Sequence, residues 1–197
     1  MVDESVNGFD PHLKKHSKQE LESPTDKRIF ALASALNDNC SVEELYSLTK
    51  IDPWFLYKFR TIIENLKLLE SYQSDPNSIT SDVLMKSKRL GFSDKMIAEC
   101  IGSNELVVRN MRIDYDIKPF VKRVDTVSAE WPAVTNYLFL TYNGSGNDIE
   151  NSCGGVMVLG SGVYRIGSSV EFDCCAVGCV QQLRKVCIFI GFQMNGF

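Results

Sequence analysis

The sequence lacks the features that mark several large classes of protein. No stretch approaches the roughly 18 uninterrupted apolar residues that span a bilayer, and the amino terminus has no apolar signal-peptide core. Neither sign of charge is in large excess, and a net charge of −4 gives no overall electrostatic case for binding nucleic acid or an anionic membrane. We therefore expect a cytoplasmic protein with no nucleic-acid partner and no membrane partner.

Candidate metal ligands are also scarce, with 7 cysteines that form no CxxC pair and only 2 histidines. Cys175 and Cys179 could share one helix face and bind a metal, but a free cysteine is more often a small buried apolar residue. His12 and His16 have the same spacing and no third ligand nearby. We expect no metal site, buried cysteines, and a solvated polar tail at residues 1–22.

Helix signals dominate the chain from Ser23 onwards. Ser23-Pro24-Thr25-Asp26 predicts a helix start with proline at its first position, and Ser41 with Glu44 forms a second capping box. Asp52-Pro53 opens a longer helix, in which apolar residues recur every three or four positions and predict one buried stripe. The stripe consists of Phe55, Phe59, Ile62, Leu66 and Leu69.

A pair of shorter helices at 97–112 resembles a DNA-reading helix-turn-helix. Gly102 fits the turn between them, as Gly91 fits the end of the helix before. The second helix carries Arg109 and Arg112, but nearby carboxylates balance their charge. We interpret the pair as a packing unit and keep DNA binding as a disfavoured alternative.

Strand signals replace helix signals at about residue 117. PFVKRVDTVSAEWP and VTNYLFLTYNG are rich in β-branched and aromatic residues, and the Asn, Gly and Ser residues of 143–155 are typical of a linker. VMVLG (156–160) reads as a strand buried on both faces. A glycine turn follows, and then a helix that Ser168 and Glu171 cap and that runs to about Lys185.

The predicted fold is therefore mostly α. A helical domain precedes an incomplete α/β unit of strand, loop and helix, which breaks off before its sheet can form. The last segment, VCIFIGFQMNGF (186–197), is apolar and uncharged, and we expect it to lack a neighbouring strand and to favour aggregation.

The glycine turn nearly fits two phosphate-binding motifs. A dinucleotide fingerprint would place a third glycine where the chain has Arg165, and it would need an acidic residue well beyond Asp173, where none occurs. A phosphate loop would need a lysine where the chain has Ser168. A turn without a ligand remains open as the alternative.

The run VMVLGSGVYRIGSSVEFD, continuing as CCAVGCVQQLRK, resembles the start of the second synthetase half of the carbamoyl phosphate synthetase large chain. Upstream, SVEELYSLTKIDPWFLYK, LGFSDKMIA and FVKRVDTVSAEWPAVTNYLFLTYNG are similar to the oligomerisation domain between the two halves. The sequence around SGVYRIGSSVEFD and VGCVQQLRK is nearest to that of the animal multifunctional pyrimidine-pathway protein. After LRK the resemblance ends, for which we expect a wrong reading frame, a retained intron or an alternative exon.

The resemblance implies a division of the chain into four segments. Residues 1–22 would be a polar leader equivalent to the tail of the preceding half, with Met1 an internal methionine of a longer chain. Residues 23–142 would be the helical oligomerisation-type domain and 143–155 a linker. Residues 156–197 would be a truncated Rossmann-like pre-ATP-grasp unit.

Members of this family are ATP-dependent ligases that make carbamoyl phosphate for the pyrimidine and arginine pathways. They use bicarbonate and ammonia that a partner amidotransferase releases from glutamine. Because Mg-ATP is held by ATP-grasp lobes that this chain does not contain, the resemblance implies no catalytic residue, cofactor or metal ligand here.

A fragment that is inactive alone is therefore expected. The alternative is an interaction module that self-associates or docks on the full-length synthetase. Gly160, Gly162, Arg165 and Gly167 match the family's glycine loop and are the candidate residues facing its reaction chamber.

Overall fold

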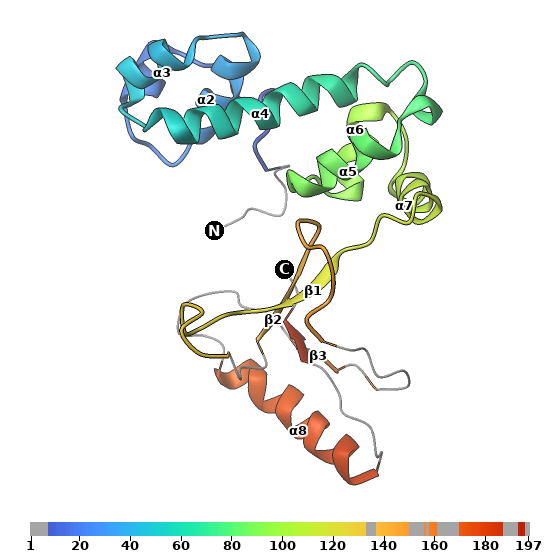
Figure 1. The fold of residues 1–197 in the computed structure, drawn as a ribbon. Helices are drawn as coiled ribbons and strands as arrows, with labels where there is room; N and C mark the ends of the chain where they lie inside the picture. Colours follow the sequence, from blue (N-terminus) through green and yellow to red (C-terminus); the bar gives the residue numbers. More distant parts are fainter. Residues whose placement is uncertain are drawn as a thin grey trace. The chain divides into compact units, whose positions relative to one another are not determined.

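The computed structural model describes residues 8–132, 137–149, 156, 158–160, 170–186 and 193–195. These residues are mostly helical, as predicted, and they belong to two compact units (Figure 1), one up to Asn147 and one from Asp148 onwards. None of the helices in the described ranges combines the length and apolar character needed to cross a membrane.

The amino-terminal segment packs on the helices that follow it. Helix α1 (Lys18–Glu22) begins at Ser17, whose hydroxyl accepts a hydrogen bond from the Glu20 N–H, and it buries Leu21. Phe9 stacks on Phe59 with ring centroids 4.8 Å apart. The expectation of a solvated tail is therefore wrong for residues 8–22, because two apolar side chains fix this polar segment to the core.

Helix α2 (Arg28–Asn37) starts later than predicted. Pro24 does not occupy its first position, and Lys27 precedes the helix without a side-chain cap. The start follows burial, since residues 31–36 are all buried, and the Arg28 Nη2 donates to the Thr49 carbonyl at 2.6 Å. Tertiary contacts thus decide this boundary where local capping does not.

Helices α3 (Val42–Thr49) and α4 (Pro53–Glu70) begin where predicted. The Ser41 hydroxyl accepts from the Glu44 N–H at 3.1 Å, and the Asp52 carboxylate accepts from the Trp54 N–H at 2.8 Å. Each bond satisfies one of the amides that a helix start leaves unpaired.

Helix α4 joins two apolar cores. Its first half contributes Leu56 and Ile63 to a core shared with α1, α2 and α3, and its second half contributes Leu66 and Leu69 to a core shared with the helices that follow. Figure 1 shows α4 running from one group of helices to the other. The predicted stripe is wrong at Phe55, which is exposed, because the buried line runs through its neighbour Leu56.

Three short helices complete the second core. They are α5 (Ser81–Arg89), α6 (Asp94–Ile101) and α7 (Glu105–Asp114), preceded by a 3-10 turn, η1 (Pro76–Ser78). Gly91 and Gly102 have φ values of +93° and +67°, the left-handed conformation that glycine adopts without strain after a helix. Both predicted helix ends are confirmed.

A two-stranded antiparallel sheet ends the first unit. Strand β1 (Phe120–Arg123) pairs with β2 (Leu138–Thr141). The chain then returns to β1, where the Asn147 side chain accepts from the Val121 N–H at 2.9 Å and the Lys122 ammonium donates to the Gly146 carbonyl at 3.2 Å. The first residues of the predicted linker are therefore packed.

The second unit contains β3 (Val158–Gly160), α8 (Val170–Val186) and β4 (Gln193–Asn195). The strand at 158–160 and the helix end near Lys185 are confirmed. The expectation that no sheet forms is wrong, because β4 pairs with β3 in parallel register, Val158 opposite Gln193. Parallel strands need a crossover connection, which α8 supplies.

Candidate functional site

The glycine loop falls mostly outside the described residues. Gly160 ends β3, whereas Gly162, Arg165, Gly167 and the predicted cap Ser168 lie beyond the described ranges. Their role in facing a reaction chamber stays a prediction.

The cysteines of α8 are not the buried apolar residues that we expected. Cys174, Cys175 and Cys179 are exposed. Within the described ranges, no three His, Cys, Asp or Glu side chains are grouped as a metal site would require.

Both histidines tie the amino-terminal segment to the helices. The His12 Nε2 lies 3.1 Å from a Glu70 oxygen on α4, and the His16 Nδ1 lies 3.3 Å from an Asp38 oxygen at the end of α2. The two imidazoles thus contact different carboxylates, and their i, i+4 spacing reflects packing.

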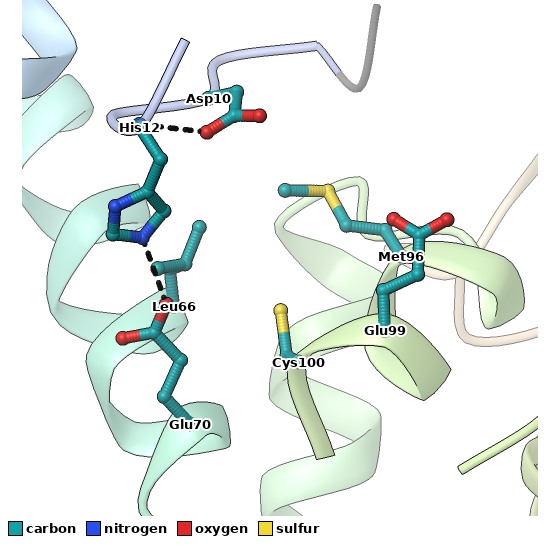
Figure 2. Close-up of a pocket in the computed structure, with 7 residues that line it drawn as sticks. All are labelled: Asp10, His12, Leu66, Glu70, Met96, Glu99 and Cys100. Atoms are coloured by element: carbon teal, nitrogen blue, oxygen red, sulfur yellow. Dashed lines mark hydrogen bonds and ion pairs between the residues drawn. The ribbon is translucent and has the colours of Figure 1, made fainter. Parts of the chain in front are cut away.

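A cavity of about 150 Å³ lies beside His12, between α4 and α6 (Figure 2). Three carboxylates and one thiol reach it, along with apolar side chains from both helices. Its lining consists of Asp10, His12, Leu66, Glu70, Met96, Glu99 and Cys100.

The thiol of this cavity is held protonated. Burial, followed by the nearby charges of Glu70, Glu99 and Asp10, raises the pKa of Cys100 to about 11. Because the thiolate is the form that attacks electrophiles and binds metals, Cys100 is poorly suited to either role at neutral pH. The carboxylates around it also disfavour a phosphorylated ligand.

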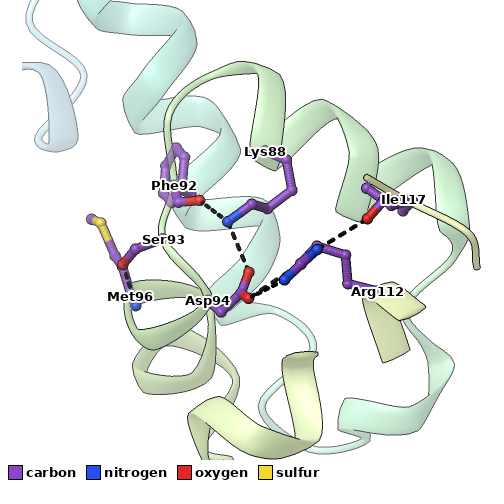
Figure 3. A network of polar contacts seen from close by, with 7 residues as sticks. All are labelled: Lys88, Phe92, Ser93, Asp94, Met96, Arg112 and Ile117. Carbon is purple, nitrogen blue, oxygen red and sulfur yellow. Dashed lines mark hydrogen bonds and ion pairs between the residues drawn. The ribbon is translucent and has the colours of Figure 1, made fainter. Parts of the chain in front are cut away.

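A network of charged groups fixes α5, α6 and α7 to one another (Figure 3). The Lys88 ammonium donates to an Asp94 oxygen and to the Phe92 carbonyl, both at 2.8 Å. The Arg112 guanidinium donates to the other Asp94 oxygen at 3.0 and 3.2 Å and to the Ile117 carbonyl at 3.1 Å. All three charged side chains are largely buried.

Burial on its own would raise the pKa of Asp94, but hydrogen bonds from Lys88 and Arg112 outweigh it, and the pKa of Asp94 is lowered. The network also bears on the helix-turn-helix alternative. Arg112, one of the two arginines that could have contacted phosphate, instead holds α7 against α6. The glycine turn between these helices is thus a packing feature.

The structure exposes aromatic side chains that the sequence did not indicate. Four aromatic side chains of α3 and α4 are exposed, with relative accessibilities of 46% for Tyr46, 61% for Trp54, 51% for Phe55 and 44% for Tyr57. We call these four residues the aromatic surface. The available signal was Trp54 beside Phe55, since two successive helix positions cannot both lie at the centre of one buried stripe.

Comparison with known families identifies the chain. Residues 1–116 match the model of the carbamoyl-phosphate synthetase large chain, oligomerisation domain. The chain belongs to this family. Residues 152–190 match the carbamoyl phosphate synthase preATP-grasp domain, which agrees with the resemblance seen in the glycine-rich segment.

Curated relatives agree with the assignment. The chain is 59% identical over 187 residues to the multifunctional protein CAD of Squalus acanthias and 47% identical over 194 residues to the mitochondrial carbamoyl-phosphate synthase [ammonia] of Mus musculus. The predicted preference for the multifunctional type is confirmed. Each alignment covers 94% of this chain but only 8% and 13% of the respective relative.

Proposed function

We propose that this chain contributes to carbamoyl phosphate synthesis as an assembly module and does not catalyse the reaction by itself. The family match of residues 1–116 to an oligomerisation domain is the observation that carries this proposal. Self-association or docking on a longer synthetase chain would be its mode of action. The exposed aromatic surface on α3 and α4 is consistent with such a role.

The reaction that this module would serve follows from the family. The complete synthetase would use ATP, bicarbonate and ammonia, with an amidotransferase partner releasing the ammonia from glutamine. The name of the mouse relative specifies ammonia as well. A pyrimidine-pathway role is favoured over an arginine-pathway role by the higher identity to the multifunctional type.

The described residues do not fit Mg-ATP, the cofactor of the family. The cavity beside His12 is lined by carboxylates that would repel a triphosphate. A second cavity, of about 330 Å³ between α5 and β2, is lined by Lys88 and Arg89, but Asp94 already pairs with the Lys88 ammonium and the Arg89 guanidinium donates to the Tyr142 carbonyl. We therefore assign no step of the reaction to these residues.

Three further expectations belong to the proposal. The borders of the four segments, at 22, 142 and 155, are inferred from the resemblance. A cytoplasmic location is favoured by the likeness to the multifunctional type, although the mouse relative is mitochondrial by name. The glycine loop at Gly160, Gly162, Arg165 and Gly167 would face a reaction chamber only within a longer chain.

An activity assay tests the catalytic half of the proposal. The purified 197 residues, supplied with ATP, bicarbonate and ammonia, should form no carbamoyl phosphate above a blank without protein. A full-length synthetase measured in the same assay is the positive control. Formation of carbamoyl phosphate by the isolated chain would refute the proposal.

Docking on the full-length synthetase is the second candidate mode of action. A tagged form of the chain, mixed with full-length large chain, should retain it on an affinity matrix if docking occurs. Retention together with a monomeric state of the isolated chain would favour docking over self-association.

A further inference from the structure

A thiol, an imidazole and a carboxylate meet where helix α2 ends. The Cys40 Sγ lies 4.0 Å from the His16 Nε2, and the His16 Nδ1 lies 3.3 Å from an Asp38 carboxylate oxygen. His16 comes from the amino-terminal segment, 24 residues before Cys40 in the chain. A nucleophile beside a base, with a third group that orients the base, is the arrangement that activates a side chain for covalent chemistry.

The end of α2 positions two of these three groups. The chain leaves the helix through Asn39, whose φ of +64° is a left-handed conformation that asparagine tolerates. The Cys40 N–H donates to the Ala35 carbonyl at 3.0 Å, and the N–H of Asn39 donates at 3.1 Å. The acceptor of this second bond is the Leu36 carbonyl. Both bonds belong to the Schellman motif that closes many helices, so Asp38 and Cys40 lie on either side of a fixed turn.

The carboxylate determines which nitrogen of the neutral His16 ring carries the proton. An ionised carboxylate only accepts hydrogen bonds, so the Nδ1 that faces Asp38 is the protonated nitrogen. The Nε2 then has a free lone pair and accepts from the Cys40 thiol. The His16 backbone N–H donates to the hydroxyl of buried Ser34 at 3.3 Å, which holds the residue in this position.

The Cys40 thiol needs a base in order to react. Burial raises its pKa, and the charges of Glu44 and Asp38 raise it further, so the resting sulfur keeps its proton. Because the thiolate is the nucleophilic form, the proton must leave as the sulfur attacks, and the His16 Nε2 is in contact to take it. Cys40 is only half-buried, which leaves the sulfur open to a small reagent.

We propose that Cys40 is a covalent modification site for small α,β-unsaturated carbonyl compounds, with His16 as its base and Asp38 as the residue that orients the imidazole. The sulfur forms a bond to the β-carbon of the compound, and the carbon–carbon π bond opens. The proton passes from the thiol to the His16 Nε2 and then to the α-carbon of the adduct. This class of electrophile fits because one imidazole serves as base and then as acid, and no external oxidant or reductant is needed.

Acrylamide labelling of the full 197-residue chain tests the base, since acrylamide is a small compound of this class. Peptide mass spectrometry over time gives a separate rate for each cysteine. His16→Gln should slow labelling of Cys40 by about tenfold or more, as expected when a general base is lost, and should leave the exposed Cys179 unchanged. An equal or faster rate at Cys40 in this variant would overturn the proposal.

His12→Gln is the matched control for loosening of the amino-terminal segment. His12 ties the same segment to Glu70 and is not part of the Cys40 site. Its loss should leave the labelling rate of Cys40 unchanged, and circular dichroism should show that both histidine variants fold. If the imidazole of His16 acted by packing alone, its removal would expose the sulfur and speed labelling. Equal slowing by the two substitutions would overturn the role of His16 as base.

Asp38→Asn tests the orienting role, because charge and orientation predict opposite results. Loss of the negative charge alone would lower the pKa of the Cys40 thiol and speed labelling. An asparagine amide can instead donate to the His16 Nδ1, which moves the ring proton to Nε2 and removes the base. We expect slower labelling of Cys40, as with His16→Gln. Faster labelling would overturn the orienting role of Asp38.

Discussion

The carboxylate of Asp94 receives hydrogen bonds from Lys88 on α5 and from Arg112 on α7, so one side chain holds three helices together. We expect Asp94→Asn to lower the free energy of unfolding by about 3 kcal/mol, because it leaves two largely buried cations without their counter-charge. Urea unfolding followed by circular dichroism measures the difference.

Asp116→Asn is the matched control for this prediction. Asp116 pairs with Lys118 in solvent, where an ion pair contributes little, and asparagine tolerates its positive φ of 52°. Its unfolding free energy should change by less than about 0.5 kcal/mol. Equal effects of the two substitutions would show that the buried network does not stabilise the fold.

The lowered pKa of Asp94 makes part of the stability depend on pH. A depressed carboxyl pKa contributes stability in full above the ordinary value of 3.8, and the contribution is lost as pH falls through the lowered folded value. The stability difference between wild type and Asp94→Asn should therefore shrink on acidification from about pH 5 to about pH 2. A constant difference over that range would contradict the linkage.

Cys100 should react slowly with alkylating reagents at neutral pH. Its pKa of about 11 leaves little thiolate to react, and half-burial limits access. Peptide mass spectrometry after brief iodoacetamide treatment should show modification at the exposed Cys179 before Cys100, with Cys100 catching up only in alkali or urea. Faster labelling of Cys100 would contradict both its burial and its raised pKa.

Helix α4 contributes side chains to both cores of the first unit. Leu69→Ala should cost about 2–5 kcal/mol, since it removes a fully buried side chain. Because α4 is shared, the substitution should also shift unfolding at the other core, reported by Trp54 fluorescence in a Trp131→Phe background. Leu106→Ala, on the exposed face of α7, should leave both transitions unchanged.

The two probes decide whether the first unit is one cooperative body. Fluorescence and circular dichroism should share a midpoint in the Leu69→Ala variant. A fluorescence transition that stays at the wild-type midpoint would show that the two cores unfold separately.

Elements fixed by local chemistry were predictable from the sequence. Ser41, Asp52 and Gly102 each act on backbone groups within a few residues, and each marks a helix boundary in the structure. Phe55 was misplaced because the spacing of apolar residues does not say which side of a helix meets its neighbours. The pairing of β3 with β4 joins residues far apart in the chain, and no local pattern predicts it.

The candidate site also has features that local sequence predicts and features that it does not. Glycine spacing argues against two phosphate-binding motifs, whose chemistry needs particular residues at fixed positions, and this stays a prediction because the loop lies mostly outside the described residues. The sequence did not predict the aromatic surface on α3 and α4, because exposure depends on how α4 is rotated against α2 and α3. The sequence also did not predict the Asp94 network, since Lys88, Asp94 and Arg112 come from three different helices.

For the molecule as a whole, we expect the two units to have different roles. The first unit contains both helical cores and the aromatic surface, so it should carry self-association by itself. The second unit contains the glycine-rich segment, which matches the preATP-grasp family over residues 152–190. Removing it should leave the fold of the first unit unchanged, as circular dichroism can confirm.

Sedimentation velocity on the full chain and on residues 1–147, compared at equal concentrations, tests the account most directly. The assembly role predicts that both dimerise with affinities equal within about a factor of three, a difference of roughly 0.6 kcal/mol. A first unit that folds yet remains monomeric, while the full chain associates, would place assembly in the second unit and contradict the account.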